Sequence, residues 1–406
     1  MPLNLEEVPG RPVSLDLRSV VPHNLAGISG KGPVVVTTTP DQWSYAGGFR
    51  FLKDRLPGAE RIAIQVECTV RQGRIGVIVV KDDLRETLGD EERAPVDGDT
   101  TIQIVVDDVP ESGWIIVRNN APGGVKSECE IRSITIYALL PSPLRGFGEW
   151  AAKDETGSRV FEALRLKWNE VPVGLAGRRK TADLLELDDQ RLERLWTETH
   201  REATTGAGYA ARGWYQQLYG DVLRGKKVLD VGSGFGIDGL TFARMGAAMT
   251  FLDIAETNLQ ALKRLCGIFR IENANFFYLQ DLNSLDGLAN DFDVIWCQGS
   301  MLHVPFEFAR REAQRLLQHL RIGGRWVELT YPPQRWEREG RLPFDKWGRC
   351  TDGAATPWAQ WYDLERVLAR LAPAEFEVVL SFNFHNDDFN WFDLHRISKP
   401  GSRWKA

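Results

Sequence analysis

The sequence lacks the features of a secreted, membrane or nucleic-acid-binding protein. Its 406 residues contain no uncharged run near the roughly 18 residues of a membrane span. The first residues lack the basic and then apolar pattern of a signal peptide. The formal net charge of -6 offers no excess of positive charge to phosphate groups. We therefore expect a cytoplasmic protein with no membrane span and no nucleic-acid partner.

Cysteine is also scarce. The five cysteines are an odd number, lie far apart and form no Cys-x-x-Cys pair. This pattern favours buried, reduced thiols over a disulfide framework, a zinc site or a redox motif. No other metal centre is expected, because the adjacent acids Asp387 and Asp388 beside His385 are typical of a solvated turn.

The chain is long and rich in tryptophan. At 406 residues it exceeds one ordinary core, so two or three domains are expected. Eight of the 14 tryptophans follow residue 295. The C-terminal part therefore carries much flat aromatic surface.

Residues 1–145 are predicted to form an antiparallel β-sandwich of jelly-roll-like type. Short β-branched or alternating runs recur there, and segments rich in Gly, Pro, Asp and Asn separate them. The predicted strands cover residues 34–39, 61–67, 75–80, 101–106, 114–118 and 130–137.

Two roles for this sandwich stay open. Its last strand, 131–137, and the turn at 119–124 are weakly similar to those of jelly-roll carbohydrate-binding modules, and Trp43 and Tyr45 are placed to stack on a sugar. The other role is a scaffold or a surface for homo-oligomerisation.

Residues 146–190 are predicted to be a linker with a helix at 159–168, and residues 191–406 a second domain. Helical spacing over 181–219 predicts two helices above a cofactor entrance, which makes His200, Tyr209 and Trp214 candidate lining residues. From residue 226 strands and helices alternate, which specifies an α/β fold with a mostly parallel sheet. The predicted strands are 227–231, 248–253, 275–279, 292–297, 324–331, 376–382 and 391–397.

A glycine-rich turn follows the first of these strands. Gly232-x-Gly234-x-Gly236 fits a methyl-donor site, while Gly234-x-Gly236-x-x-Gly239 followed by Asp253 also fits a dinucleotide site. The glycines alone leave both cofactors open.

Three features favour the methyl donor. Asp230 would crowd a pyrophosphate but suits a zwitterionic amino-acid group, and Asp281 after the third strand can accept a hydrogen bond from an adenine amino group. The chain also contains only one such unit and closes with two strands that can pair as a hairpin. These features predict a doubly wound, Rossmann-like sheet of seven strands, one of them antiparallel.

Residues 226–397 resemble the class I S-adenosylmethionine-dependent methyltransferases. Val228-Leu-Asp-Val-Gly-Ser-Gly-Phe-Gly236 is similar to their first motif, 292–304 to their fourth strand and its loop, and 320–329 to the turn before the fifth. The resemblance implies S-adenosylmethionine as cofactor, with Asp253 on the ribose hydroxyls and Asp281 and Leu282 beside adenine. The implied cofactor-binding residues are Asp230, Gly232, Gly234, Gly236, Asp253, Ile254, Asp281, Leu282 and Gln298.

Methyl transfer to a hydroxyl is helped by a nearby base. His303, just after the fourth strand, is the first candidate. The alternative interpretation of this residue is a structural one, in which it starts a helix and bonds to the backbone. His385, in the turn between the last two strands, is the second candidate.

The segment after the fifth strand points to the acceptor. Aromatic and arginine side chains interleave there, which suits a sugar ring, although a hydrophobic lid packed on itself explains them equally well. The predicted substrate residues are Tyr209, Tyr331, Arg335, Trp336, Trp358 and Trp361. We expect O-methylation of a sugar, polysaccharide or glycosylated small molecule; the alternatives are a small-molecule or lipid methyltransferase, an NAD-dependent oxidoreductase and a glycan-binding assembly protein.

Overall fold

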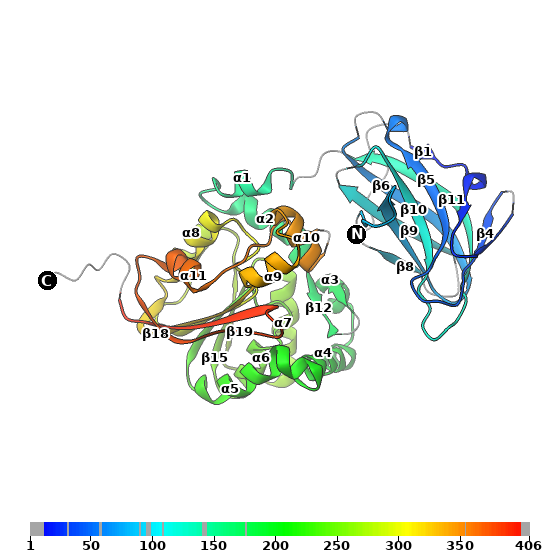
Figure 1. Ribbon diagram of the computed structural model, residues 1–406. Helices are drawn as coiled ribbons and strands as arrows, with labels where there is room; N and C mark the ends of the chain where they lie inside the picture. Colours follow the sequence, from blue (N-terminus) through cyan, green and yellow to red (C-terminus); the bar gives the residue numbers. More distant parts are fainter. Residues whose placement is uncertain are drawn as a thin grey trace. The chain divides into compact units, whose positions relative to one another are not determined.

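The computed structural model describes residues 12–30, 32–56, 59–88, 91–94, 99–107, 109–139, 144–174, 177–353 and 355–398. The chain divides into two compact units, Met1–Arg145 and Gly146–Ala406, and Figure 1 draws both. Residues 146–190 belong to the second unit and are not a linker. Within them Arg165, on helix α2 (Ser158–Trp168), bonds the backbone oxygens of Ile254 and Leu279, which follow two strands of the large sheet.

Unit 1 consists of two antiparallel sheets. One has the strand order β3 (Gly27–Ser29), β4 (Val34–Thr37), β11 (Glu128–Leu139), β6 (Arg61–Gln72) and β9 (Asp99–Asp107), with β1 (Val13–Ser14) also paired to β11. The other has the order β2 (Val21–Pro22), β5 (Tyr45–Leu52), β10 (Ser112–Asn119), β7 (Ile75–Lys81) and β8 (Glu92–Ala94). Short 3-10 turns, η2 (Leu17–Ser19) and η3 (Lys53–Arg55), lie between strands.

Side chains from both sheets share one apolar core. Alternate residues of a strand point to the same face, so β6 buries Ile62, Ile64 and Val66 on the side that meets the second sheet. Phe49 of β5 and Val77 of β7 enter the same core from the other sheet. A β-rich N-terminal region is thus confirmed.

Unit 2 is built on a seven-stranded sheet. Its order is β16 (Ala274–Tyr278), β15 (Ala248–Asp253), β14 (Lys227–Val231), β17 (Phe292–Gln298), β18 (Leu320–Thr330), β20 (Phe389–Arg396) and β19 (Phe376–Phe384). Strands β14 to β18 are parallel, whereas β20 is antiparallel to both of its neighbours. The expected Rossmann-like α/β fold is confirmed.

Helices cover both faces of this sheet. Figure 1 shows α5 (Trp214–Val222) and α6 (Gly239–Arg244) on one face, and α8 (Phe306–Leu316) and α11 (Leu364–Leu371) on the other. Unit 2 also contains the helices α1 (Phe147–Ala151), α3 (Thr181–Leu185), α4 (Asp189–Thr204), the π-helical turn η5 (Tyr209–Gly213), α7 (Glu256–Phe269) and the 3-10 segment η6 (Leu282–Gly287).

Two additions to the sheet bring further side chains to the carboxyl ends of the strands. A small hairpin, β12 (Glu170–Pro172) and β13 (Arg178–Lys180), follows α2. Helices α9 (Pro333–Arg338) and α10 (Phe344–Asp352) lie between β18 and α11. We call residues 331–363 the insertion.

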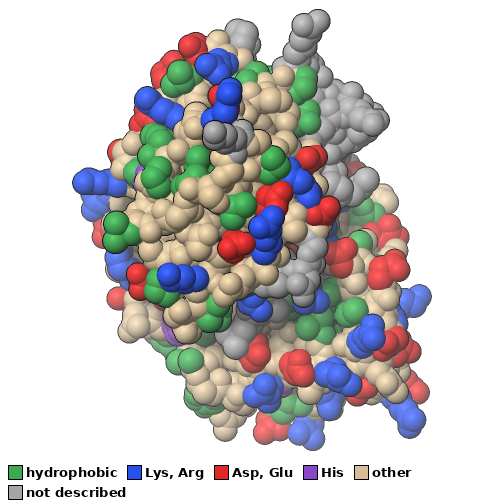
Figure 2. All heavy atoms as spheres, turned by 90° about the vertical axis from the view of Figure 1, so that its right-hand side faces the viewer, with side chains coloured by type: hydrophobic (Ala, Val, Ile, Leu, Met, Phe, Trp, Pro, Cys, Tyr) green, Lys and Arg blue, Asp and Glu red, His purple; other side chains and the backbone are tan. Residues whose placement is uncertain are grey.

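The surface carries charges of both signs. Figure 2 shows acidic and basic side chains interspersed over the face that it draws. Among the described residues, no helix has the length and apolar content to cross a membrane. Within the same part of the chain, His, Cys, Asp and Glu side chains form no group of three or more that would hold a metal ion.

Candidate active site

The turn after β14 has a backbone that favours glycine. Gly232, Gly234 and Gly236 have φ angles of 75°, 52° and 68°, in the left-handed region that side chains disfavour. A Cβ atom on Gly232 would also lie 2.5 Å from the Cβ atom of Ser300. The turn therefore lets the chain after β17 approach it closely.

Two buried acids flank this turn. The Asp253 carboxylate accepts hydrogen bonds from the backbone N–H groups of Gly234 at 2.9 Å and Ala255 at 2.8 Å. Burial raises the pKa of Asp253, and these hydrogen bonds act in the opposite direction. Burial, together with the charges of Asp238 and Asp253, also raises the pKa of Asp230. Hydrogen-bond donors or a positive charge on a bound ligand would offset the negative charge of these neighbouring carboxylates.

A cavity of about 560 Å³ opens over the carboxyl ends of the sheet strands. This is the edge at which ligands bind in open α/β sheets. It is lined by seven of the expected cofactor residues, which are Asp230, Gly232, Gly234, Gly236, Asp253, Ile254 and Gln298.

Asp281 and Leu282 occupy other positions. The Asp281 carboxylate caps η6 by accepting the N–H of Ser284 at 2.8 Å, and the Leu282 side chain is buried. Neither is among the described residues that line the cavity. Their contact with adenine stays a prediction.

His303 lies in the cavity wall. Its Nδ1 is 3.0 Å from the backbone oxygen of Trp358, and its ring packs 4.5 Å from that of Trp168. Because a carbonyl oxygen only accepts, Nδ1 carries the hydrogen and Nε2 holds the basic lone pair. Burial lowers the pKa of this histidine, so it is neutral near pH 7.

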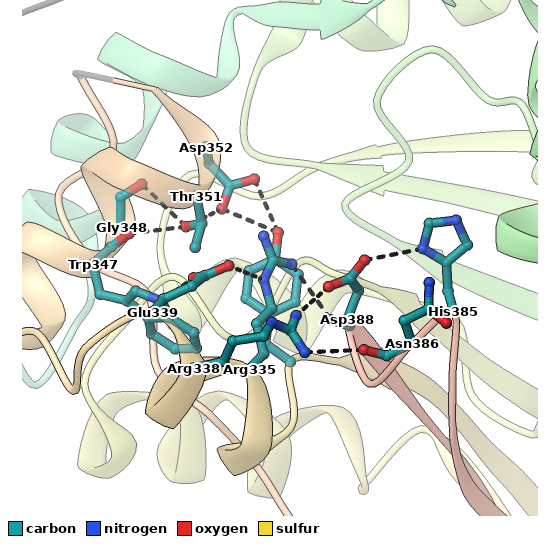
Figure 3. Close-up of polar contacts among 11 residues, drawn as sticks. Arg335, Arg338, Glu339, Trp347, Gly348, Thr351, Asp352, His385, Asn386 and Asp388 are labelled. Atoms are coloured by element: carbon teal, nitrogen blue, oxygen red, sulfur yellow. Dashed lines mark hydrogen bonds and ion pairs between the residues drawn. The ribbon is translucent and has the colours of Figure 1, made fainter.

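The other candidate base is elsewhere. His385 lies in the turn between β19 and β20, with Nδ1 3.1 Å from Asp388. Figure 3 shows it on the far side of Asp388 from α10, and it is not among the lining residues.

Of the six expected substrate residues, only Tyr331 lines the cavity described here. Arg335 stacks on the Tyr331 ring at 4.2 Å, and Trp336 packs against Phe344 and Trp361. Trp358 also packs against Phe344, and the Tyr209 hydroxyl donates to Gln217. In this structure the aromatic residues of the insertion mostly pack on one another.

The earlier helices line the cavity through residues other than those expected. His200 stacks on Trp196 and Trp214 packs on Trp391, whereas Thr199, Glu202 and Arg212 line the cavity.

Several lining residues carry no signal in the sequence. Trp168, Glu170 and Arg178 come from α2 and the β12–β13 hairpin, and Asp352 ends α10. They belong to no motif and reach the cavity only through tertiary folding. The spacing of residues could not have identified them.

Polar atoms in the wall also lack partners. Both amide atoms of Gln298 and the hydroxyl of Ser300 are buried without a hydrogen bond among the described residues. Buried polar groups are normally satisfied, so these atoms are suited to a bound ligand.

In unit 1, the Trp43 side chain is 42% exposed and has a φ of 70°. The guanidinium groups of Arg118 and Arg93 lie 4.8 and 5.4 Å from its ring centre. Tyr45 is half-buried and meets His23 edge to face. Cations thus already contact the ring that is expected to stack on a sugar.

Comparison with known proteins adds two kinds of relative. The Ubiquinone biosynthesis O-methyltransferase of Neisseria meningitidis serogroup C (strain 053442) is 34% identical over 84 residues, which is 20% of this chain and 35% of that protein. The mitochondrial enzyme of the same name from Schizosaccharomyces pombe is 30% identical over 106 residues, 26% of this chain and 38% of that protein. The chain thus spans little more than a third of the length of these relatives.

Solved structures with similar folds include magnesium protoporphyrin IX methyltransferase from Synechocystis PCC 6803 with bound S-adenosylhomocysteine. It is 18% identical, has a TM-score of 0.36, and the match covers 54% of this chain and 100% of that one. The N-methyltransferase NodS from Bradyrhizobium japonicum WM9 is 16% identical and has a TM-score of 0.34. The match covers 46% of this chain and 85% of that one.

A family model described as "Methyltransferase domain" matches residues 228–324. The matched segment starts in the strand before the glycine turn and ends within β18. It therefore favours the methyl donor over the dinucleotide that the glycines left open. The second unit contains a class I methyltransferase domain whose cofactor is S-adenosylmethionine.

Proposed function

We propose that the protein transfers a methyl group from S-adenosylmethionine to a hydroxyl group of a small acceptor, with His303 as the base. The observation that carries this proposal is the position of His303. It is buried in the cavity wall, and its Nδ1 bond to Trp358 leaves Nε2 as the basic nitrogen.

The residues around the glycine turn fit the cofactor. A zwitterionic amino-acid group with a cationic ammonium suits the buried acid Asp230, and two neighbouring hydroxyls suit Asp253. The glycines, which these positive φ angles favour, place no side chain in the path of the ligand.

The bound cofactor supplies an electrophilic methyl carbon, and the electrons of its carbon–sulfur bond stay on sulfur when the methyl group leaves. The acceptor oxygen gains the methyl group and must lose its proton. Nε2 of His303 takes that proton, because burial keeps the ring neutral beforehand. Gln298 and Ser300, whose buried polar atoms have no hydrogen bond among the described residues, offer hydrogen bonds to the ligands of the cavity.

The proposed acceptor class is a sugar, a polysaccharide precursor or a glycosylated small molecule. Trp168 supplies a flat ring in the cavity wall, and Tyr331, Gln298 and Ser300 supply polar atoms in the same wall. Flat rings beside hydrogen-bonding groups suit a polyhydroxylated ring. The names of the relatives favour a second candidate, an aromatic or lipid-like O-methylation substrate.

The β-sandwich then serves as an accessory domain, either as a glycan reader or as a surface for homo-oligomerisation. A glycan array with the full-length protein and its Trp43→Ala variant separates these roles. If the natural protein retains a glycan and the variant does not, the sandwich is a glycan-binding domain.

The test uses labelled methyl donor with a panel of nucleotide sugars, sugar phosphates and phenols, and reads the labelled product by mass. We expect His303→Gln to lower the turnover rate by about 100-fold or more, in the usual range for a general base. Its affinity for S-adenosylhomocysteine, measured by calorimetry, should be nearly unchanged.

His385→Gln is the matched control, because this histidine lies outside the cavity and should leave turnover as it is. If both variants or neither lose turnover, His303 is not the base. If the natural protein shows no heat with S-adenosylmethionine or its demethylated product, the proposed activity itself is wrong.

A further inference from the structure

We propose that Asp352 is the positioning residue of the acceptor site: its carboxylate holds the Tyr331 hydroxyl and stabilises His303 when that ring takes a proton. The role rests on the proposed function of His303 as the base. Asp352 belongs to none of the sequence motifs named above and lies outside the segment that the family model matches.

Asp352 is the last residue of α10 and lines the cavity together with Tyr331 and His303. The Tyr331 hydroxyl donates to its two carboxylate oxygens at 3.0 and 3.1 Å. The neighbouring Thr351 hydroxyl lies 2.8 Å from the second of these oxygens. Figure 3 shows Asp352 and Thr351 together at the end of the helix, on the side facing these contacts.

The Asp352 carboxylate has no cation in contact with it among the described residues. Its hydrogen bonds come from two neutral hydroxyls, and a carboxylate has room for about four. Arg335, the nearest guanidinium on the Tyr331 ring, pairs with Glu339 at 3.0 Å instead. The charge of Asp352 does act on the Arg335 guanidinium, but no cation among the described residues contacts this half-buried carboxylate.

Tyr331 is fixed in place by its own neighbours. The Arg335 guanidinium lies 4.2 Å from its ring centre, and Trp347 and Phe389 pack at 5.8 and 6.0 Å. Burial and the charge of Asp352 raise its pKa, so the hydroxyl keeps its hydrogen. Since that hydrogen points to Asp352, the oxygen can only accept a further hydrogen bond.

This part of the wall is thus made of acceptors. Tyr331 Oη, the Asp352 carboxylate and the His303 Nε2 all receive hydrogen bonds from a ligand. An acceptor molecule with several hydroxyl groups satisfies them, whereas one that only accepts hydrogen bonds leaves them unpaired. The arrangement selects polyhydroxylated acceptors.

The charge of Asp352 acts on His303 against the cations that face the same ring. Burial lowers the pKa of His303 most, Asp352 from α10 and the backbone bond to Trp358 raise it, and Arg178 from β13 and Lys167 from α2 lower it. Both cations are paired with Glu170, at 3.0 and 2.7 Å. Asp352 is therefore the one carboxylate among these groups with no cation in contact, and it favours the protonated imidazole that methyl transfer produces.

The test measures the pKa of His303 directly by NMR titration of the full-length protein with labelled histidine. The signal is assigned as the one that His303→Gln removes. We expect Asp352→Asn, which keeps the shape and removes the charge, to lower the pKa of His303 by about half a unit or more. Calorimetry with S-adenosylhomocysteine shows whether this variant keeps the folded cofactor site.

Asp345→Asn is the matched control. Asp345 is a carboxylate in the first turn of the same helix, is half exposed and lies beside Arg349, so its loss should leave the pKa of His303 within about 0.1 unit. Tyr331→Phe is a second variant: it frees the carboxylate from one donor and should not lower the pKa of His303.

An unchanged pKa of His303 in Asp352→Asn overturns the proposal, and so does an equal fall in Asp345→Asn. A fall confined to Asp352→Asn supports it. These outcomes do not depend on turnover, so they are distinct from a failure of the proposed activity, which shows as loss of cofactor binding by the natural protein.

Discussion

At the scale of single residues, Glu312 is a carboxylic acid buried in the cavity wall with no hydrogen-bond or ion-pair partner among the described residues. Burial raises its pKa to about 7, while Arg370 acts in the opposite direction. The folded state therefore keeps a proton on Glu312 between about pH 4.5 and 7, whereas the unfolded state loses it. Stability falls with rising pH across this window.

We predict that Glu312→Gln stabilises the protein at pH 8 and has little effect at pH 5. A shift of this size corresponds to about 3 kcal/mol, because each pKa unit is worth about 1.4 kcal/mol. Urea unfolding of both proteins at the two pH values, without cofactor, measures it. An advantage of the variant that is equal at both values would show that the acid is not strained by burial.

Residues also differ in how well the sequence reveals them. The glycines and acids around the turn follow from spacing alone, because a backbone conformation and a neighbouring strand dictate their types. Asp352 and Trp168 do not, because their cavity positions depend on where α10 and α2 pack. The sequence ranks His303, after β17, ahead of His385, in the turn between β19 and β20, and the structure places only the first of them among the described residues that line the cavity.

At the scale of elements, the parallel strands are the easiest to predict. They are short apolar runs bounded by glycines and acids, and β14, β15 and β17 lie within one residue of their expected limits. Strand β5 of unit 1 escapes prediction because Gly47 and Gly48 interrupt its pattern. Its partners β2 and β10 nevertheless pair with it through these glycines.

Close packing explains why the second glycine of β5 is a glycine. A Cβ atom on Gly48 would lie 2.7 Å from Nε2 of His23 and 3.1 Å from side-chain atoms of both Ile116 and Trp114. Gly48→Ala should therefore lower the free energy of unfolding by about 1 to 3 kcal/mol, as overpacking does. Gly27→Ala in β3 is the control, since its nearest neighbour would lie at an ordinary 3.6 Å. Equal midpoints of urea unfolding for the two variants would show that space at Gly48 does not matter.

At the scale of the whole molecule, the two units have separate cores. Among the described residues, the main buried apolar cluster of unit 1 draws on residues between 34 and 136, and a buried apolar cluster of unit 2 draws on residues between 171 and 391. Only unit 2 contains the methyltransferase domain. If each unit unfolds as one cooperative body, we expect the cofactor to add stability to unit 2 alone.

We predict two thermal transitions in calorimetry of the full-length protein. S-adenosylhomocysteine at about 100 times its dissociation constant should stabilise one of them by roughly 2.7 kcal/mol and leave the other in place. Gly48→Ala should move only the transition that the ligand leaves in place, because the substitution lies in unit 1. A single transition that shifts with both the ligand and the substitution would mean that unit 1 and unit 2 unfold as one body, and that unit 1 contributes directly to the stability of the site.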